Sequence, residues 1–501
     1  MQTICRFLRN AFARGALLTL GALSLAEAGE PHRYRVSIDP SMQRMVVEAR
    51  FDSSVDTVTA RSRDAGEFLI DVRDCDDASP IRLRNRRMML PAGGIRCMNY
   101  TVDLAAAARS GAYNRSLAAE NIVVSPALWL WRPVLKGDAE LHVHFDLPKG
   151  LGVSVPWQSL EPGSNSYRLG RSPESSQAPA VFGKFDYSEI EVPGSVLRVS
   201  VLRTGDEKSH AMDVEAINEW LRSTATDVSL AYGRFPNPSP LVVVIPADDR
   251  RQSSSAVPFG RVIRDGGEAI ELFVNRDRPI GAFRDDWTAT HEFSHLMLPY
   301  VAPAHRWVSE GFAQYYQNVL LARSGTYEPL DAWQKLYDGL ERGRQSRPEL
   351  SPNDATARGM RNGRMKIYWS GAAIALMADV TLRERSGGSM TLDDVMGRLQ
   401  DCCLPSDRTW SGPELFETLD RLAGVPVFMP LYKRHADTAG FPDTRPLFAR
   451  LGLVVTDDGL KVGRGGELRA IRTAITEADR YVQLARHERS GRRPAGSAGS
   501  R

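Results

Sequence analysis

Hydrophobic and polar residues alternate along the N-terminal third of the chain with the period of two that is typical of half-buried strands. The clearest runs are Tyr34–Ile38, Met45–Ala49, Phe68–Val72 and Ala139–Phe145, and segments rich in Gly, Pro, Asn and Asp separate them. Strands with one apolar face and frequent turns predict a β-sandwich, which we assign to residues 29–190.

The spacing of apolar residues changes after residue 190. A strand at Val196–Leu202 precedes a segment with helical periodicity at Asp213–Tyr232, and two more strands are predicted at Leu241–Ile245 and Glu268–Asn275. Residues 331–453 have a helical pattern throughout. We therefore predict a multidomain α+β protein, with a second domain at 191–330, a helical domain at 331–455 and a partly disordered C-terminal extension at 456–501.

The strongest chemical signal is the run His291-Glu292-Phe293-Ser294-His295, an HExxH motif. Positions i and i+4 of a helix lie on one face, so both imidazoles can hold one metal ion. A catalytic zinc ion takes three protein ligands and leaves a fourth position for water. The motif predicts His291 and His295 as ligands and Glu292 as the general base that acts on the water.

A second helical stretch, Trp307–Tyr316, follows the motif after a short link. A link of this length sets neighbouring helices antiparallel, which brings Glu310 within reach of the two histidines. Glu310 is therefore the predicted third ligand of one Zn²⁺ ion.

The segments HEFSH and WVSEGFAQYY resemble the gluzincin peptidases, and the M61 (glycyl aminopeptidase-like) family most closely, which is related to the M1 aminopeptidases. The resemblance implies a thermolysin-like zinc peptidase domain at 191–330 and the role of third ligand for Glu310. It also implies that Tyr368, in Tyr-Trp-Ser-Gly-Ala, stabilises the tetrahedral intermediate, although Ser370 replaces the family's Lys.

The resemblance also suggests residues that surround the metal ligands. Aminopeptidases of this kind carry a Gly-rich acidic segment before the motif that captures the substrate's free amine, and Gly267 and Glu268 match it loosely. In gluzincins an edge strand at the place of Glu268–Asn275 binds the peptide by strand addition. Gln314, one turn after Glu310, is a candidate to orient a ligand histidine. The spacer between His295 and Glu310 is shorter than in the family, so specificity is not carried over.

The N-terminus predicts export. Arg6, Arg9 and Arg14 precede the apolar run Gly15–Leu25, and Ala-Glu-Ala ending at Ala28 is a signal-peptidase site. We therefore predict a signal peptide at 1–28 and a periplasmic or secreted protein. The apolar run is shorter than the ~20 residues of a membrane span, so no stable membrane insertion is expected.

Four cysteines remain after the signal peptide: Cys75, Cys97, Cys402 and Cys403. An even number in an exported chain suggests disulfides. Cys75–Cys97 is the simplest pair, whereas the adjacent Cys402 and Cys403 either form a vicinal bridge or stay reduced. The formal net charge is +3 with no basic stripe, so nucleic acid is not an expected partner.

These observations predict a zinc-dependent metallopeptidase that acts on peptides or proteins. The family resemblance favours an aminopeptidase. An endopeptidase of the same fold and a non-catalytic protein that binds peptides in a peptidase-like cleft remain as alternatives. The sequence does not define the oligomeric state.

Overall fold

The computed structural model describes residues 30–84, 87–110, 121–135, 140–170, 178–203, 212–247, 255–264 and 266–477. The predicted signal peptide, its cleavage site at Ala28 and most of the predicted C-terminal tail lie outside these residues. Within the described ranges, no helix combines the length and the apolar character that a membrane span requires.

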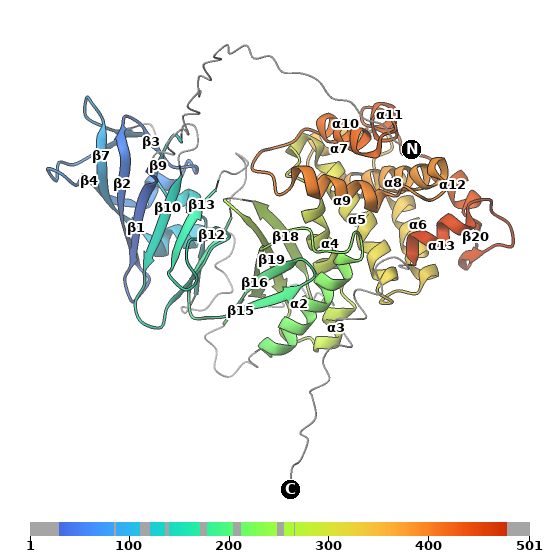
Figure 1. Cartoon of the computed structure of the whole chain (residues 1–501), viewed down its shortest axis with the longest axis horizontal. Coiled ribbons are helices and arrows are strands. Elements are labelled where there is room, and N and C mark those ends of the chain that lie inside the picture. Colours follow the sequence, from blue (N-terminus) through green and yellow to red (C-terminus); the bar gives the residue numbers. More distant parts are fainter. Residues whose placement is uncertain are drawn as a thin grey trace, which may run out of the picture.

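The N-terminal region consists of strands around one hydrophobic core (Figure 1). A seven-stranded sheet has the order β12-β13-β10-β1-β2-β7-β4, and smaller sheets have the orders β11-β14-β8 and β5-β6-β3-β9. The strands are β1 (His32–Ile38), β2 (Arg44–Val55), β3 (Val58–Thr59), β4 (Leu69–Asp74), β5 (Arg82–Arg84), β6 (Arg87–Met89), β7 (Ile95–Asp103), β8 (Asn121–Val124), β9 (Arg132–Pro133), β10 (Leu141–Asp146), β11 (Gly152–Ser154), β12 (Gln158–Ser159), β13 (Ser166–Leu169) and β14 (Ala180–Gly183), with the short helices η1 (Ala65–Glu67), α1 (Leu104–Ser110) and η2 (Pro126–Leu128).

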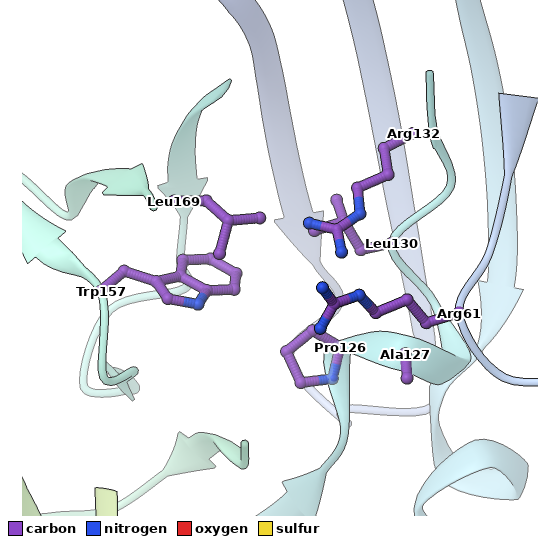
Figure 2. A pocket seen from close by; sticks show the side chains of 7 residues that line it. All are labelled: Arg61, Pro126, Ala127, Leu130, Arg132, Trp157 and Leu169. Atoms are coloured by element: carbon purple, nitrogen blue, oxygen red, sulfur yellow. The ribbon is translucent and has the colours of Figure 1, made fainter. Parts of the chain in front are cut away.

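The predicted alternation is confirmed in this region. Every second residue of β1 is buried, and Trp129, Phe145, Trp157 and Phe182 pack together in the core behind the strands. A cavity of about 10 Å³ remains beside this core, which leaves room for one water at most. Figure 2 shows the side chains that line it, among which the guanidinium groups of two arginines lie close together: Arg61, Pro126, Ala127, Leu130, Arg132, Trp157 and Leu169.

The simplest predicted pair is bonded in the structure, and of the two alternatives for Cys402 and Cys403 the structure has the vicinal bridge. Cys75, which follows β4, is joined to Cys97 in β7, and Cys402 is joined to its neighbour Cys403. The first bridge links two neighbouring strands of the large sheet, so it fixes part of the N-terminal region only.

A five-stranded sheet with the order β15-β16-β17-β19-β18 follows. Its members are β15 (Phe185–Val192), β16 (Ser195–Leu202), β17 (Leu241–Pro246), β18 (Phe259–Arg264) and β19 (Glu268–Val274), and helix α2 (Val214–Ser229) packs against it. Because β15 pairs with β16 along its whole length, this sheet begins before the predicted boundary at residue 190.

The sheet order corrects one prediction. The strand that the sequence placed at Glu268–Asn275 is β19, but it lies between β17 and β18 and pairs with both. The edges of the sheet are β15 and β18, and β18, which runs antiparallel to β19, is the edge that contacts the helix of residues Thr288–Ser294. A peptide that adds to the sheet beside this helix must therefore pair with β18.

The remainder of the described chain is mainly helical, as predicted (Figure 1). The helices are α3 (Ile280–Arg284), α4 (Thr288–Ser294), η3 (His295–Met297), η4 (Pro303–His305), α5 (Arg306–Arg323), α6 (Pro329–Gln345), α7 (Pro352–Ala357), α8 (Met360–Ser386), α9 (Leu392–Cys403), α10 (Gly412–Ala423), α11 (Phe428–His435), α12 (Arg445–Arg450) and α13 (Arg469–Thr476), with a hairpin of β20 (Leu453–Thr456) and β21 (Gly459–Val462). Ile475 is fully buried, and its carbonyl accepts a hydrogen bond from Arg323 of α5. The ordered part thus extends past the predicted end at residue 455.

Helices α5 and α8 pack closely against each other at two glycines, Gly311 and Gly371. A Cβ atom at Gly371 would lie 2.1 Å from the carbonyl oxygen of Trp307 and 2.8 Å from the Cα atom of Gly311. Only a residue without a side chain allows two backbones to approach so closely. Further along the same helices, the hydroxyl of Tyr315 donates a hydrogen bond of 2.7 Å to Asp379, and both residues are buried.

We predict that Gly371→Ala destabilises the fold. Alanine is the better helix former by about 1 kcal/mol, but overpacking against backbone that cannot move aside costs about 1–3 kcal/mol or more. The midpoint of urea unfolding should therefore fall. Gly281→Ala on α3 is the matched control, because a Cβ atom there meets nothing within 4 Å. An unchanged midpoint in Gly371→Ala would show that the two helices have room to separate.

Candidate metal centre and active site

The HExxH motif lies on α4 and the 3₁₀ turn η3, as its spacing predicts. The helix begins beside Asp286, whose carboxylate accepts a hydrogen bond of 2.9 Å from the backbone N–H of Thr288. Both histidines of the motif are buried, with 2% of His291 and 9% of His295 exposed. Buried imidazoles on one helical face are positioned to act together on a single ligand.

The structure brings Glu310 of α5 to these two histidines. Its Oε2 atom is 3.5 Å from Nε2 of His291 and 3.4 Å from Nε2 of His295. Tetrahedral zinc with ligand bonds of about 2.0–2.1 Å separates its ligand atoms by about 3.3 Å, so the three atoms fit one ion. Among the described residues, this is the group of His, Cys, Asp and Glu side chains arranged to hold a metal.

The outer nitrogens of the two histidines differ in their surroundings. Nδ1 of His295 forms a hydrogen bond of 3.0 Å with the hydroxyl of Ser309, which leaves Nε2 for a metal. Nδ1 of His291 is buried and has no partner among the described residues. The side chain of Gln314 is buried, but the described structure contains no hydrogen bond from it to either histidine. Ser309, next to Glu310 in the sequence, was not predicted to orient a ligand.

The charges of Glu310 and His295 stabilise each other. Burial by itself would raise the pKa of Glu310, but hydrogen bonds to His291 and His295 bring it well below its usual value. Burial likewise opposes the charged form of His295, and Glu310 outweighs this effect and raises the pKa of that imidazole. Glu310 therefore carries the negative charge that a divalent cation requires.

Glu292 belongs to α4, and its side chain lies against the edge strand β18. A Cβ atom at Gly260 of β18 would lie 2.6 Å from Cγ of Glu292, so the edge strand passes directly beside this side chain. Burial raises the pKa of the Glu292 carboxyl, and the nearby histidines partly oppose this change. A carboxylate that holds protons more readily than usual is suited to accept one and release it again.

Tyr368 reaches the cluster from α8. Its ring stacks on that of His291, with centroids 5.7 Å apart and an angle of 18° between the planes. Burial raises the pKa of its hydroxyl, and the negative charges of Glu310 and Glu292 raise it further. The phenol is therefore held in its protonated form, in which it can donate a hydrogen bond.

The two predicted amine-binding residues, Gly267 and Glu268, contact other parts of the protein. Gly267 belongs to the turn before β19, where a Cβ atom would lie 1.9 Å from the carbonyl oxygen of Pro156 in the N-terminal region. Glu268 is paired with Arg264 at 2.7 Å and with the amide of Asn237 at 2.6 Å. Both of its oxygens are thus engaged with the protein, because the acidic segment lies at the start of an inner strand instead of along the edge.

Arg264, paired with Glu268, holds the C-terminal end of the helix that carries the HExxH motif. Nη2 of Arg264 donates hydrogen bonds of 3.0 Å to the carbonyl of His295 and 2.9 Å to that of Leu298. These carbonyls belong to the end of the motif, where backbone acceptors lack helical partners and a cation is favourable. Arg264 therefore fixes the segment that carries the second histidine.

Comparisons with known proteins agree with this arrangement. Residues 300–374, which include Glu310 and Tyr368, match the M61 glycyl aminopeptidase family model. The M61 resemblance predicted from the motifs is thereby confirmed over this segment. No curated protein sequence matches the chain.

Two solved structures are similar to this chain at low sequence identity. An aminopeptidase N family protein from Idiomarina loihiensis has a TM-score of 0.60 and 15% identity, over 85% of this chain and 80% of its own. An M1 zinc metallopeptidase from Deinococcus radiodurans has a TM-score of 0.49 and 12% identity, over 83% of this chain and 94% of its own. The first of these likenesses shows that the mixed α/β multidomain fold resembles that of an aminopeptidase N family protein.

We predict that Glu268→Gln weakens the metal centre rather than amine recognition. Removing one partner of a buried ion pair costs about 3 kcal/mol, because the guanidinium of Arg264 stays buried without its counter-charge. The free energy of unfolding and the affinity for a divalent metal should both fall. Denaturant unfolding measures the first quantity, and metal titration measures the second. Glu48→Gln, which breaks an exposed pair with Arg50, is the control and should cost less than about 1 kcal/mol.

Hydrolysis of N-terminally blocked and free peptides separates the two roles of Glu268. If Glu268 supports the helix that carries the HExxH motif, Glu268→Gln should lower the hydrolysis of both kinds of peptide equally. A loss confined to peptides with a free amine would instead establish Glu268 as the amine anchor.

Proposed function

We propose that this protein is a zinc-dependent metallopeptidase that hydrolyses peptide bonds. The observation that carries the proposal is the cluster of the buried His291 and His295 with the partly buried Glu310, which has Glu292 and Tyr368 beside it. The M61 family match over residues 300–374 supports the same reaction class. All five side chains that the proposed reaction needs are present and adjacent.

A zinc ion on these ligands would polarise the scissile carbonyl and lower the pKa of a water toward about 7. Glu292 accepts the proton of the attacking water and delivers it to the leaving amine. Its position beside Gly260 places it next to a peptide chain that pairs with the edge strand β18.

Tyr368 donates its hydroxyl proton in a hydrogen bond to the oxygen that becomes negative during the reaction. The stack on His291 keeps the phenol close to the ligands. Trp287 meets His291 edge-on at 5.7 Å and is 39% exposed, so it offers an apolar wall to a bound peptide.

Two modes of cleavage are compatible with this centre. The family match favours an aminopeptidase. The pairing of Glu268 with Arg264 favours an endopeptidase, because this carboxylate is not available to hold a free amine. We further propose that the protein works in an oxidising compartment outside the cytoplasm, which accords with the disulfide between Cys75 and Cys97 and with the signal-like N-terminus.

We predict that Glu292→Gln abolishes hydrolysis while the fold and the zinc content are retained. Loss of a general base lowers turnover by about 10²–10⁴-fold, whereas the amide keeps the shape of the side chain. The measurement is mass-spectrometric mapping of cleavage sites in a mixed peptide library, half of it N-terminally blocked. Near-normal turnover in the variant would reject the assignment of Glu292.

The same library decides between the modes of action. Removal of single residues from unblocked peptides identifies an aminopeptidase, and internal cuts in both halves identify an endopeptidase. If the zinc-loaded wild type cleaves nothing, the proposal fails in favour of a protein that binds peptides in a peptidase-like cleft.

We predict that Tyr368→Phe lowers kcat by about 10²–10³-fold with little change in KM, because the lost hydrogen bond forms mainly in the transition state. Steady-state kinetics on a cleaved library peptide measure both constants, and the zinc content provides the control. A change in KM alone would indicate that Tyr368 binds the ground state instead.

A further inference from the structure

An arginine borders the proposed active site. Arg364 lies on α8 one turn before Tyr368, and its guanidinium carbon is 5.8 Å from the centre of the Tyr368 ring. The ring of Tyr368 in turn stacks on His291. A positive charge and a predicted metal ligand thus contact the same aromatic ring.

This charge is exposed, and no carboxylate of the described residues forms an ion pair with it. The first turn of α8 contains no acidic residue, and Arg361 adds another exposed positive charge there. Lys366 is buried instead and donates a hydrogen bond to the carbonyl of Gly440. The N-terminal end of a helix carries partial positive charge, which strengthens the local field.

The negative charges nearby are already engaged. Glu310 contacts both histidines, Glu292 is buried against β18, and Glu268 is paired with Arg264. The exposed charge beside the ring of Tyr368 is therefore positive, whereas a pocket for a substrate's free amine needs negative charge. A guanidinium in such a position is suited to a carboxylate, which it can bind with two parallel hydrogen bonds.

We propose that Arg364 is a specificity-determining residue that binds a carboxylate of the peptide substrate close to the bond that is cut. The guanidinium carbon of Arg364 lies 5.8 Å from the centre of the Tyr368 ring. An extended peptide advances about 3.3 Å per residue, so the bound carboxylate lies within about two residues of the scissile bond. It belongs to an Asp or Glu side chain or to the C-terminus of a short peptide. This inference rests on the proposed peptidase function and names its substrate class.

The contact with Tyr368 suggests a second role that an experiment must separate. A guanidinium over an aromatic ring can also hold that ring in place. Positioning of Tyr368 would affect all substrates equally, whereas recognition affects only substrates with a carboxylate. Arg342 is the matched control, because its guanidinium carbon lies 5.5 Å from the centre of the next ring on α8, that of Trp369, which packs against α6.

The test uses pairs of peptides that differ only in Glu or Gln within two residues of the cut site, each with a free or an amidated C-terminus. The kcat/KM of the zinc-loaded full chain is measured for wild type, Arg364→Gln and Arg342→Gln. We expect wild type and Arg342→Gln to prefer the carboxylate member by roughly three- to tenfold. Arg364→Gln should lose this preference and keep its rate on the uncharged member. The amidated peptides show whether the carboxylate is that of the side chain or of the C-terminus.

Binding separates this inference from the proposed function. The same peptides are titrated into zinc-loaded Glu292→Gln with and without Arg364→Gln, and the dissociation constants are compared. If no peptide is hydrolysed but the carboxylate peptides still bind more tightly through Arg364, the peptidase function fails and the recognition site stands. Equal binding and equal hydrolysis of both members by wild type would overturn the recognition site alone, as would an equal loss on both members in Arg364→Gln.

Discussion

The contact between Gly311 and Gly371 is the constraint on which the proposed site depends. Glu310 immediately precedes the first glycine, and Tyr368 lies three residues before the second, on the same face of α8. Where the backbones of α5 and α8 touch, these two side chains are brought to the same place, above the histidines of α4. Any side chain at the contact would separate a ligand from the residue proposed to stabilise the oxyanion. The arrangement of the three proposed ligands and Tyr368 therefore requires glycine at both positions, Gly311 and Gly371.

The short helix α4 is held at both ends by the sheet side of the molecule. At its start, Asp286 accepts hydrogen bonds from the backbone of Thr288 and Val257. At its end, Arg264 contacts the carbonyls of His295 and Leu298 and is balanced by Glu268. A helix of two turns has little stability of its own, so these contacts determine the direction of its histidines. The turn that precedes Glu268 packs on Pro156 and Trp157, which connects the N-terminal region to the same support.

Whether the sequence predicts a contact of this site depends on how far apart the two partners lie along the chain. The two histidines share a face because of helical spacing, and Glu310 follows after a short link, so local rules suffice for the three ligands. The place of Glu268 depends on the order of strands, which is not local, and the sequence does not reveal that β18 covers its strand. The bond from Ser309 to His295 depends on how two helices meet, and no motif indicates it. Likewise, the pattern that predicts strands in residues 29–190 does not locate the boundary at β15, because a strand of either sheet alternates in the same way.

In the proposed function, the distribution of charge would separate binding of the metal from binding of the substrate. The two histidines are buried and Glu310 is partly buried, so their electrostatic interactions are stronger and less screened by water than those at the surface. Arg364 lies at the exposed rim, where the same charge interacts more weakly and is screened by salt. A strong interior interaction suits a resident ion that must not dissociate during turnover, and a weak rim interaction suits a substrate that must leave as product.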